Sequence, residues 1–172
     1  DCYGGQIVRG EQLLGGIDWD EINPATGPLF VEGAQPGDLL KVTIVDIRTA
    51  SQGVMTAATG EGAVGCKLSC DRTRIIPVRD GCVHFSDQLV LEAAPMIGVI
   101  GTAPAQGQEI PTGTPDRHGG NMDNTRICKG AVLYFPVNVE GALLAMGDLH
   151  ALMSDGEVLV CGLEIAGEVE AK

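Results

Sequence analysis

Apolar and polar residues alternate most clearly between Leu39 and Thr49. Val42 and Ile44 alternate there with lysine and threonine, which is the two-residue period of a half-buried β-strand. Past Ile44 the apolar positions move to Val45 and Ile47, so the inward-facing set changes within the run. We expect a β-bulge, or burial of both faces, at this point.

Short β-branched runs elsewhere, punctuated by glycine and proline, predict further strands. The expected strands are Pro28–Glu32, Thr73–Val78, Gln88–Glu92, Ile97–Gly101, Ala131–Val137, Ala142–Met146 and Val158–Ile165. Only Glu11–Leu14 and Leu149–Met153 indicate helix, with about one turn each. This is too little helix to cover a parallel sheet, so we expect a mainly β fold with antiparallel or mixed sheets. A sandwich, a jelly roll or an irregular barrel fits this spacing of strands.

The charge of the chain excludes some kinds of binding partner. Lys and Arg total 11 against 23 for Asp and Glu, which gives a formal net charge of -12. Such a surface repels a phosphate backbone or an anionic membrane, so no nucleic acid and no membrane is expected as a partner. No run approaches the roughly 20 apolar residues that cross a bilayer. A length of 172 residues suits one domain, and we expect residues 1–172 to form a single β-rich domain.

The cysteines show no pattern of a disulfide framework or of a zinc site. The six are Cys2, Cys66, Cys70, Cys82, Cys128 and Cys161, and no Cys-x-x-Cys pair occurs among them. Cys66 and Cys70 are the only close pair, and two more nearby ligands would be needed for zinc. Free, mostly buried thiols in a reducing cytoplasm are therefore expected.

Two of the three histidines stand in polar, glycine-punctuated segments. In the Gly147–His150 segment, Asp148 and His150 are two residues apart, so in extended backbone they point to one face, roughly 7 Å apart. Imidazole nitrogen and carboxylate oxygen suit zinc, and an open coordination position can activate water. The alternative is that Asp148 accepts hydrogen bonds in a turn and His150 is a half-buried polar residue. Glu157, after a turn signal, either returns near His150 or is an exposed carboxylate.

The segment His118–Asp123 forms the second candidate site, after Pro104–Asp116, a stretch expected to be an exposed loop. Gly119 and Gly120 allow close approach of the backbone to a ligand, and such N–H groups can stabilise an oxyanion. No Gly-x-Ser-x-Gly elbow accompanies them, which argues against a serine hydrolase.

Several ordered segments resemble the acetamidase/formamidase family along nearly the whole chain. They are Asp1–Ile7, Asn23–Pro28, Ile97–Pro104, His118–Asp123, Pro136–Leu143, Gly147–His150 and Asp155–Val158. Family members usually extend beyond the positions that match Asp1 and Glu164. The resemblance therefore implies that residues 1–172 are the central portion of such a protein.

What this resemblance implies is a β-rich fold and metal-dependent hydrolysis of short linear amides to carboxylate and ammonia. The family's metal-site residues fall on Asp1, His118, Asp123, Asp148, His150 and Glu157. Zinc suits the histidines, and a second, harder ion such as calcium suits the carboxylates. Glu157 is the expected general acid/base, with Asn121 and the backbone of Gly119 and Gly120 holding the oxyanion. A homo-oligomer, in the simplest case a dimer, is the expected assembly.

Two other readings remain open at this point. The first is a catalytically silent binding or assembly module that keeps the family's β framework, because a shortened chain can lack walls of the substrate pocket. The second is a cysteine hydrolase that uses Cys128 or Cys161 with a histidine, although both cysteines stand where burial is the simpler explanation.

Overall fold

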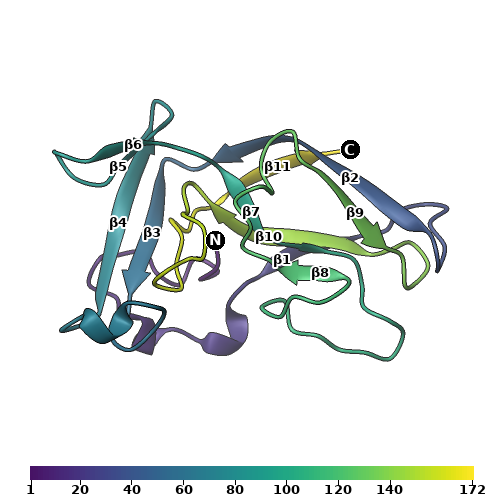
Figure 1. The fold of residues 1–172 in the computed structure, drawn as a ribbon, viewed down its shortest axis with the longest axis horizontal. Coiled ribbons are helices and arrows are strands. Elements are labelled where there is room, and N and C mark those ends of the chain that lie inside the picture. Colours follow the sequence, from purple (N-terminus) through teal and green to yellow (C-terminus); the bar gives the residue numbers. More distant parts are fainter.

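Strands carry almost all of the regular structure in the computed structural model, which describes residues 1–172 (Figure 1). The strands are β1 Ala25–Leu29, β2 Leu39–Thr49, β3 Gln52–Ala57, β4 Arg72–Arg79, β5 Cys82–His84, β6 Val90–Glu92, β7 Met96–Gly101, β8 Gly119–Asn121, β9 Val132–Pro136, β10 Leu144–His150 and β11 Gly167–Ala171. Helix is limited to three short 3-10 turns, η1 Leu14–Gly16, η2 Trp19–Glu21 and η3 Gly65–Lys67. The prediction of a mainly β fold is confirmed.

The strands form three open sheets, in the orders β1-β10-β7-β8, β11-β2-β9 and β3-β4-β5-β6. Every strand pairing is antiparallel and no sheet closes into a barrel, so the mixed-sheet and barrel alternatives do not apply. Figure 1 shows strands β3 to β6 at one end of the molecule and β2 and β9 toward the other. None of the helical segments has the length and apolar character that crossing a bilayer requires.

Glu164 lies where two of the sheets meet. Isolated antiparallel bridges join it to Val54 of β3 on one side and to His150 of β10 on the other. The main core surrounds this junction, and its largest fully buried side chains include Ile76, Ile97 and Leu163. Burial of one such side chain stabilises the fold by about 1.5–3 kcal/mol relative to exposure.

Strand β2 has the bounds that the alternating pattern predicts, and its change of face is a bulge. Ala171 pairs with Ile44 and Glu170 pairs with Asp46, so one step along β11 spans two residues of β2. Val45 is left without a partner at this step and is 40 % exposed. Burial of both faces is therefore not the explanation.

Four other predicted strands are confirmed to within two residues at each end, namely Thr73–Val78, Gln88–Glu92, Ile97–Gly101 and Ala131–Val137. The predicted Pro28–Glu32 lies three residues too late, because β1 starts at Ala25 and ends at Leu29. The loop Pro104–Asp116 has no regular strand or helix and is mostly exposed, as expected.

Two predicted elements near the C-terminal end are wrong. Val158–Ile165 is not a strand, because its first part is a tight turn in which Val160 has φ 55°. Only Glu164 of that run forms β-bridges. Leu149–Met153 is not a helical turn, because its first two residues complete β10 and pair with β7.

Three more boundaries or elements differ from the prediction. Strand β10 begins at Leu144 and not at Ala142, because Ala142 and Leu143 both have φ 56° in a turn. The predicted turn Glu11–Leu14 is displaced to Leu14–Gly16. Strands β3, β5, β8 and β11 were not predicted.

Candidate functional site

The pairing of β10 with β7 builds the base of the site. Gly147 pairs with Val99 and Leu149 with Ile97, so Asp148 stands opposite Gly98. A Cβ atom on Gly98 would collide with the carboxylates of Asp148 and Asp123. Glycine at this position therefore leaves the room in which the two acids meet.

Four carboxylates surround the imidazole of His150. From His150 Nε2 the distances are 3.1 Å to Glu164 Oε1, 3.3 Å to Asp148 Oδ1, and 4.0 Å each to Asp123 Oδ1 and Glu157 Oε1. The acids come from different parts of the chain: Asp148 from β10, Asp123 from the residues after β8, and the two glutamates from the segment after β10.

Several polar atoms of this cluster are buried without a hydrogen-bond partner. They are Oδ1 of Asp123, Oδ1 of Asp148 and both ring nitrogens of His150. The side chains of His150 and Asp148 are 0 % and 3 % exposed. Buried polar groups in folded proteins nearly always have a partner, so these atoms form a donor set with unused binding capacity.

The crowding of acids changes the protonation of the cluster. Burial alone lowers the pKa of His150, but its interaction with Asp148 and Glu164 outweighs this and raises the pKa to about 11. Burial, followed by repulsion from Asp123, raises the pKa of Glu157 to about 7. Burial raises the pKa of Glu164 to about 8. In the metal-free chain, a proton on His150 and protons on the two glutamates offset part of the negative charge of the cluster.

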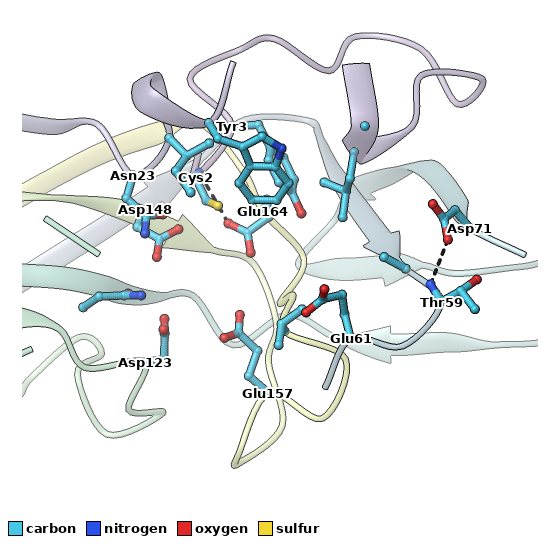
Figure 2. Close-up of a pocket in the computed structure, with 17 residues that line it drawn as sticks. Cys2, Tyr3, Asn23, Thr59, Glu61, Asp71, Asp123, Asp148, Glu157 and Glu164 are labelled. Carbon is cyan, nitrogen blue, oxygen red and sulfur yellow. Dashed lines mark hydrogen bonds between the residues drawn. The ribbon is translucent and has the colours of Figure 1, made fainter. Parts of the chain in front are cut away.

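A cavity of about 630 Å³ opens beside the cluster. Figure 2 shows the carboxylates of Asp123, Asp148, Glu157 and Glu164 around one space in this cavity. Apolar side chains line another part of the wall, namely Leu14, Trp19, Ile22 and Val160. Apolar walls with a few convergent polar groups are typical of small-molecule sites.

Of the six metal-site residues expected from the sequence, the structure brings four together. These are Asp123, Asp148, His150 and Glu157. Asp1 belongs to none of the groups of converging donors, and its carboxylate accepts a hydrogen bond from the Gly5 amide at 3.2 Å. His118 is buried in a separate groove, beside Thr102 and Ile110.

The three residues expected to hold an oxyanion have different surroundings. Asn121 lines the main cavity, and its side-chain oxygen has no partner. Gly119 and Gly120 do not line the cavity. The Gly119 amide donates to the Asp116 carbonyl at 2.9 Å and is therefore already used.

Glu164 and Cys2 are site residues that the sequence prediction missed. A signal for Glu164 was present, because it is a charged residue between Leu163 and Ile165 in an apolar run. For Cys2 no local pattern pointed to the site, since its position depends on the N-terminal segment lying beside Glu164. Its amide donates to Glu164 Oε2 at 3.4 Å.

The cysteines are all free, as predicted, but the expectation that they are mostly buried is wrong, because only Cys161 is buried. Cys66 and Cys70 are exposed and join no group of converging donors. Cys161 is buried, its Sγ accepts a hydrogen bond from the Tyr3 hydroxyl, and burial raises its pKa to about 11. A nucleophilic thiolate at this position is not favoured.

The protein is therefore a mainly β protein in which a buried histidine–carboxylate centre lies beside a cavity. The family described as the Acetamidase/Formamidase family matches residues 1–112 and 107–172. The chain belongs to this family.

Named relatives resemble the chain along its whole length. A formamidase from Methylophilus methylotrophus is 29% identical over 232 residues, covering 100% of this chain and 56% of the relative. The crystal structure of an acetamidase from Bacillus halodurans has a TM-score of 0.97 and 54% identity, covering 100% of this chain and 58% of that one. A predicted acetamidase/formamidase from Thermoanaerobacter tengcongensis gives a TM-score of 0.94 and 52% identity, with 100% and 57% covered. The chain thus spans somewhat more than half the length of these relatives.

Proposed function

We propose that this chain carries the centre for hydrolysis of short linear amides, of the formamide or acetamide type, to carboxylate and ammonia. Family membership supports this, because relatives along its whole length are named formamidase and acetamidase. The observation that carries the proposal is the set of unpartnered donors on Asp123, Asp148 and His150 beside the cavity.

These three residues fit a divalent cation. One donor atom from each lies within 4.8 Å of the other two, and none has a hydrogen-bond partner. Zinc suits this mixture of imidazole and carboxylate, and a second, harder cation such as calcium suits the surplus carboxylates. When bound, such a cation lowers the pKa of water and polarises an amide carbonyl. Asp1 and His118 are not included in this ligand set, because they lie outside the converging groups.

Glu157 is the proposed general acid/base. Its carboxylate lines the cavity and is 20 % exposed, so it can reach both the cluster and a substrate. Burial and repulsion from Asp123 raise the pKa of this carboxyl to about 7 in the metal-free chain, which favours proton uptake from water. The proton passes to the amide nitrogen, which leaves poorly unless it is protonated.

Asn121 and the apolar wall position the substrate. The Asn121 side chain carries N–H donors at the cavity, where they can hold the carbonyl oxygen as negative charge develops. The oxyanion contact is assigned to Asn121 because the Gly119 amide is already hydrogen-bonded. Trp19 and Leu14 supply the surface for the acyl group.

Substitution separates the ligands from the general base. We expect Asp148→Ala and His150→Ala to lose bound zinc and ammonia release together. Glu157→Gln keeps most of the zinc and loses ammonia release, because an amide cannot accept the proton. Glu32→Gln, an exposed change, leaves both quantities unaltered. Full activity of Glu157→Gln contradicts its role, and zinc retained by both alanine variants places the ion elsewhere.

The same assay decides between an enzyme and a silent binding module. Residues 1–172 cover 56% and 58% of two relatives, so any walls of their sites that lie in the rest of those relatives are not represented in this segment. Zinc binding without ammonia release from a panel of short amides would favour the module.

We propose that the protein forms a homodimer and that it works in a reducing cytoplasm. Leu39, Val132 and Tyr134 are 64%, 46% and 58% exposed on the outer face of β2 and β9, which offers an apolar surface to a second copy. Light scattering after size exclusion gives the molar mass, and a monomer at micromolar concentration contradicts the dimer.

A further inference from the structure

The thiol of Cys2 lies among the acids of the cluster. Cys2 Sγ and one carboxylate oxygen each of Asp148 and Glu164 all lie within 4.8 Å of one another. Figure 2 shows the sulfur beside the Glu164 carboxylate, on the side of the cavity where Asp148 lies. This set shares Asp148 with the set of Asp123, Asp148 and His150, and it shares Glu164 with a third set of His150, Glu157 and Glu164.

The two acids beside Cys2 are arranged as ligands. The Asp148 side chain is 3 % exposed, and its Oδ1 has no hydrogen-bond partner. Glu164 is 2% exposed, and its two oxygens are held by the amides of Gly162 and Cys2, at 3.1 Å and 3.4 Å. One oxygen of each of these two buried carboxylates lies within 4.8 Å of the sulfur atom.

Other roles for this thiol do not fit its surroundings. Neighbouring carboxylates disfavour a free thiolate, so Cys2 is poorly placed as a nucleophile. The thiol is free, and Asp148 and Glu164 are the two acids that converge with it. A cation between these groups would reverse the electrostatic balance, because it attracts both the carboxylates and a thiolate.

We propose that Cys2 is a thiolate ligand of a divalent cation that it shares with Asp148 and Glu164. The proposal rests on the cation assigned to this cluster under the proposed function, and it adds a ligand and a selectivity. As the sulfur–metal bond forms, the S–H bond breaks and the proton leaves to solvent. A thiolate is a soft ligand, so the site should prefer Zn²⁺, Co²⁺ or Cd²⁺ to Mg²⁺ and Ca²⁺.

Cobalt titration of the full chain tests this ligand without an activity assay. We expect Co²⁺ to give a thiolate-to-metal charge-transfer band in the near ultraviolet. Cys2→Ser should abolish the band and weaken Co²⁺ binding by about tenfold or more. Cys82→Ser is the matched control, because Cys82 is also half-buried but lies in β5 away from the cluster, and it should keep both.

Alkylation of the unsubstituted chain tests the same ligand without a variant. Zn²⁺ should slow carbamidomethylation of Cys2 by about tenfold or more, as followed by mass spectrometry, and leave Cys82 unaffected. Equal rates with and without Zn²⁺ overturn the proposal.

The outcomes separate this inference from the proposed function. Cobalt that binds without a charge-transfer band, or with a band that survives Cys2→Ser, overturns the role of Cys2 and leaves the His150 centre intact. If equilibrium dialysis finds that the chain binds neither Co²⁺ nor Zn²⁺, the cation itself is lost and both proposals fail.

Discussion

Glu164 Oε1 lies 3.1 Å from His150 Nε2, and the two side chains are almost completely removed from solvent. Glu164 lies in the segment that bridges β3 and β10, so the position of its carboxylate depends on the packing of both sheets. Asp148 Oδ1 lies near the same ring nitrogen, at 3.3 Å, so Glu164 is placed to share a cation bound there, and loss of its charge should weaken metal binding.

Glu164→Gln should therefore weaken Zn²⁺ binding by about 10–100-fold, because the amide keeps the volume but removes the charge. Competition with a chromophoric chelator measures the affinity. Glu92→Gln, at an exposed position of β6, serves as the control and should leave the affinity unchanged. Equal affinity of the Glu164 variant and the unsubstituted chain would exclude this residue from the cation site.

Gly98→Ala should remove the cation site while leaving the fold in place. The added methyl group would collide with the carboxylates of Asp148 and Asp123, both of which can move toward the cavity that they line. We expect Zn²⁺ affinity to fall by about tenfold or more, with an unchanged far-ultraviolet circular dichroism spectrum. Gly16→Ala is the matched control, because a Cβ atom there meets open space. Full affinity in Gly98→Ala would mean that the two acids do not share an ion.

Strands with a clear local period could be predicted from the sequence, and strands without one could not. In β2 the bounds follow from the alternating run, and the change of apolar face after Ile44 marks the bulge, which was one of the two explanations that the sequence left open. Strand β5 was missed although Asp80 and Gly81, with φ 52° and 72°, form the two-residue turn typical of a β-hairpin. The run after Glu157 looks like a strand, but a turn with left-handed backbone replaces it.

Local pattern alone predicted the site only where its residues are close in sequence, whereas Asp123 and Glu157 were identified through the family resemblance. Asp148 and His150 share one strand, so the two-residue period predicted that they meet, although Asp148 has φ 54° and not the extended backbone that was assumed. Glu164 and Cys2 reach the same space through the pairing of distant segments, and no local pattern encodes that register. For His118 the resemblance identified the motif, whereas the structure places its side chain in another groove.

Binding of Zn²⁺ at neutral pH should release at least about one proton, because a ligand imidazole must be neutral. The pKa of His150 is raised to about 11 by Asp148 and Glu164, so the metal-free chain holds a proton there at pH 7. Affinity should consequently increase with pH, by about tenfold per pH unit for each proton released. Calorimetry in buffers of different ionisation enthalpy counts the protons. A count of zero at pH 7 would contradict either the protonated state of His150 or its role as a ligand.

The stability of the metal-free chain should depend on pH through Glu157. Its pKa is about 7 in the folded chain and 4.5 for an ordinary glutamate, because burial and Asp123 disfavour the charged form. Between these two values the folded chain keeps a proton that the unfolded chain has lost, so stability from this group falls as the pH rises through this window.

Glu157→Gln cannot ionise and should escape that loss. In the presence of a chelator, we compare the free energy of unfolding of Glu157→Gln with that of the unsubstituted chain. The difference, variant minus unsubstituted, should rise by roughly 1–3 kcal/mol between pH 4.5 and pH 8. Urea unfolding at several pH values measures this difference. For the exposed control Glu32→Gln, the difference from the unsubstituted chain should be nearly independent of pH. Saturating Zn²⁺ should reduce this rise in the stability difference, because a cation stabilises the ionised carboxylate. A difference that is independent of pH without metal would show that Glu157 does not ionise against its neighbours, and its assignment as a base near neutral pH would lose its physical support.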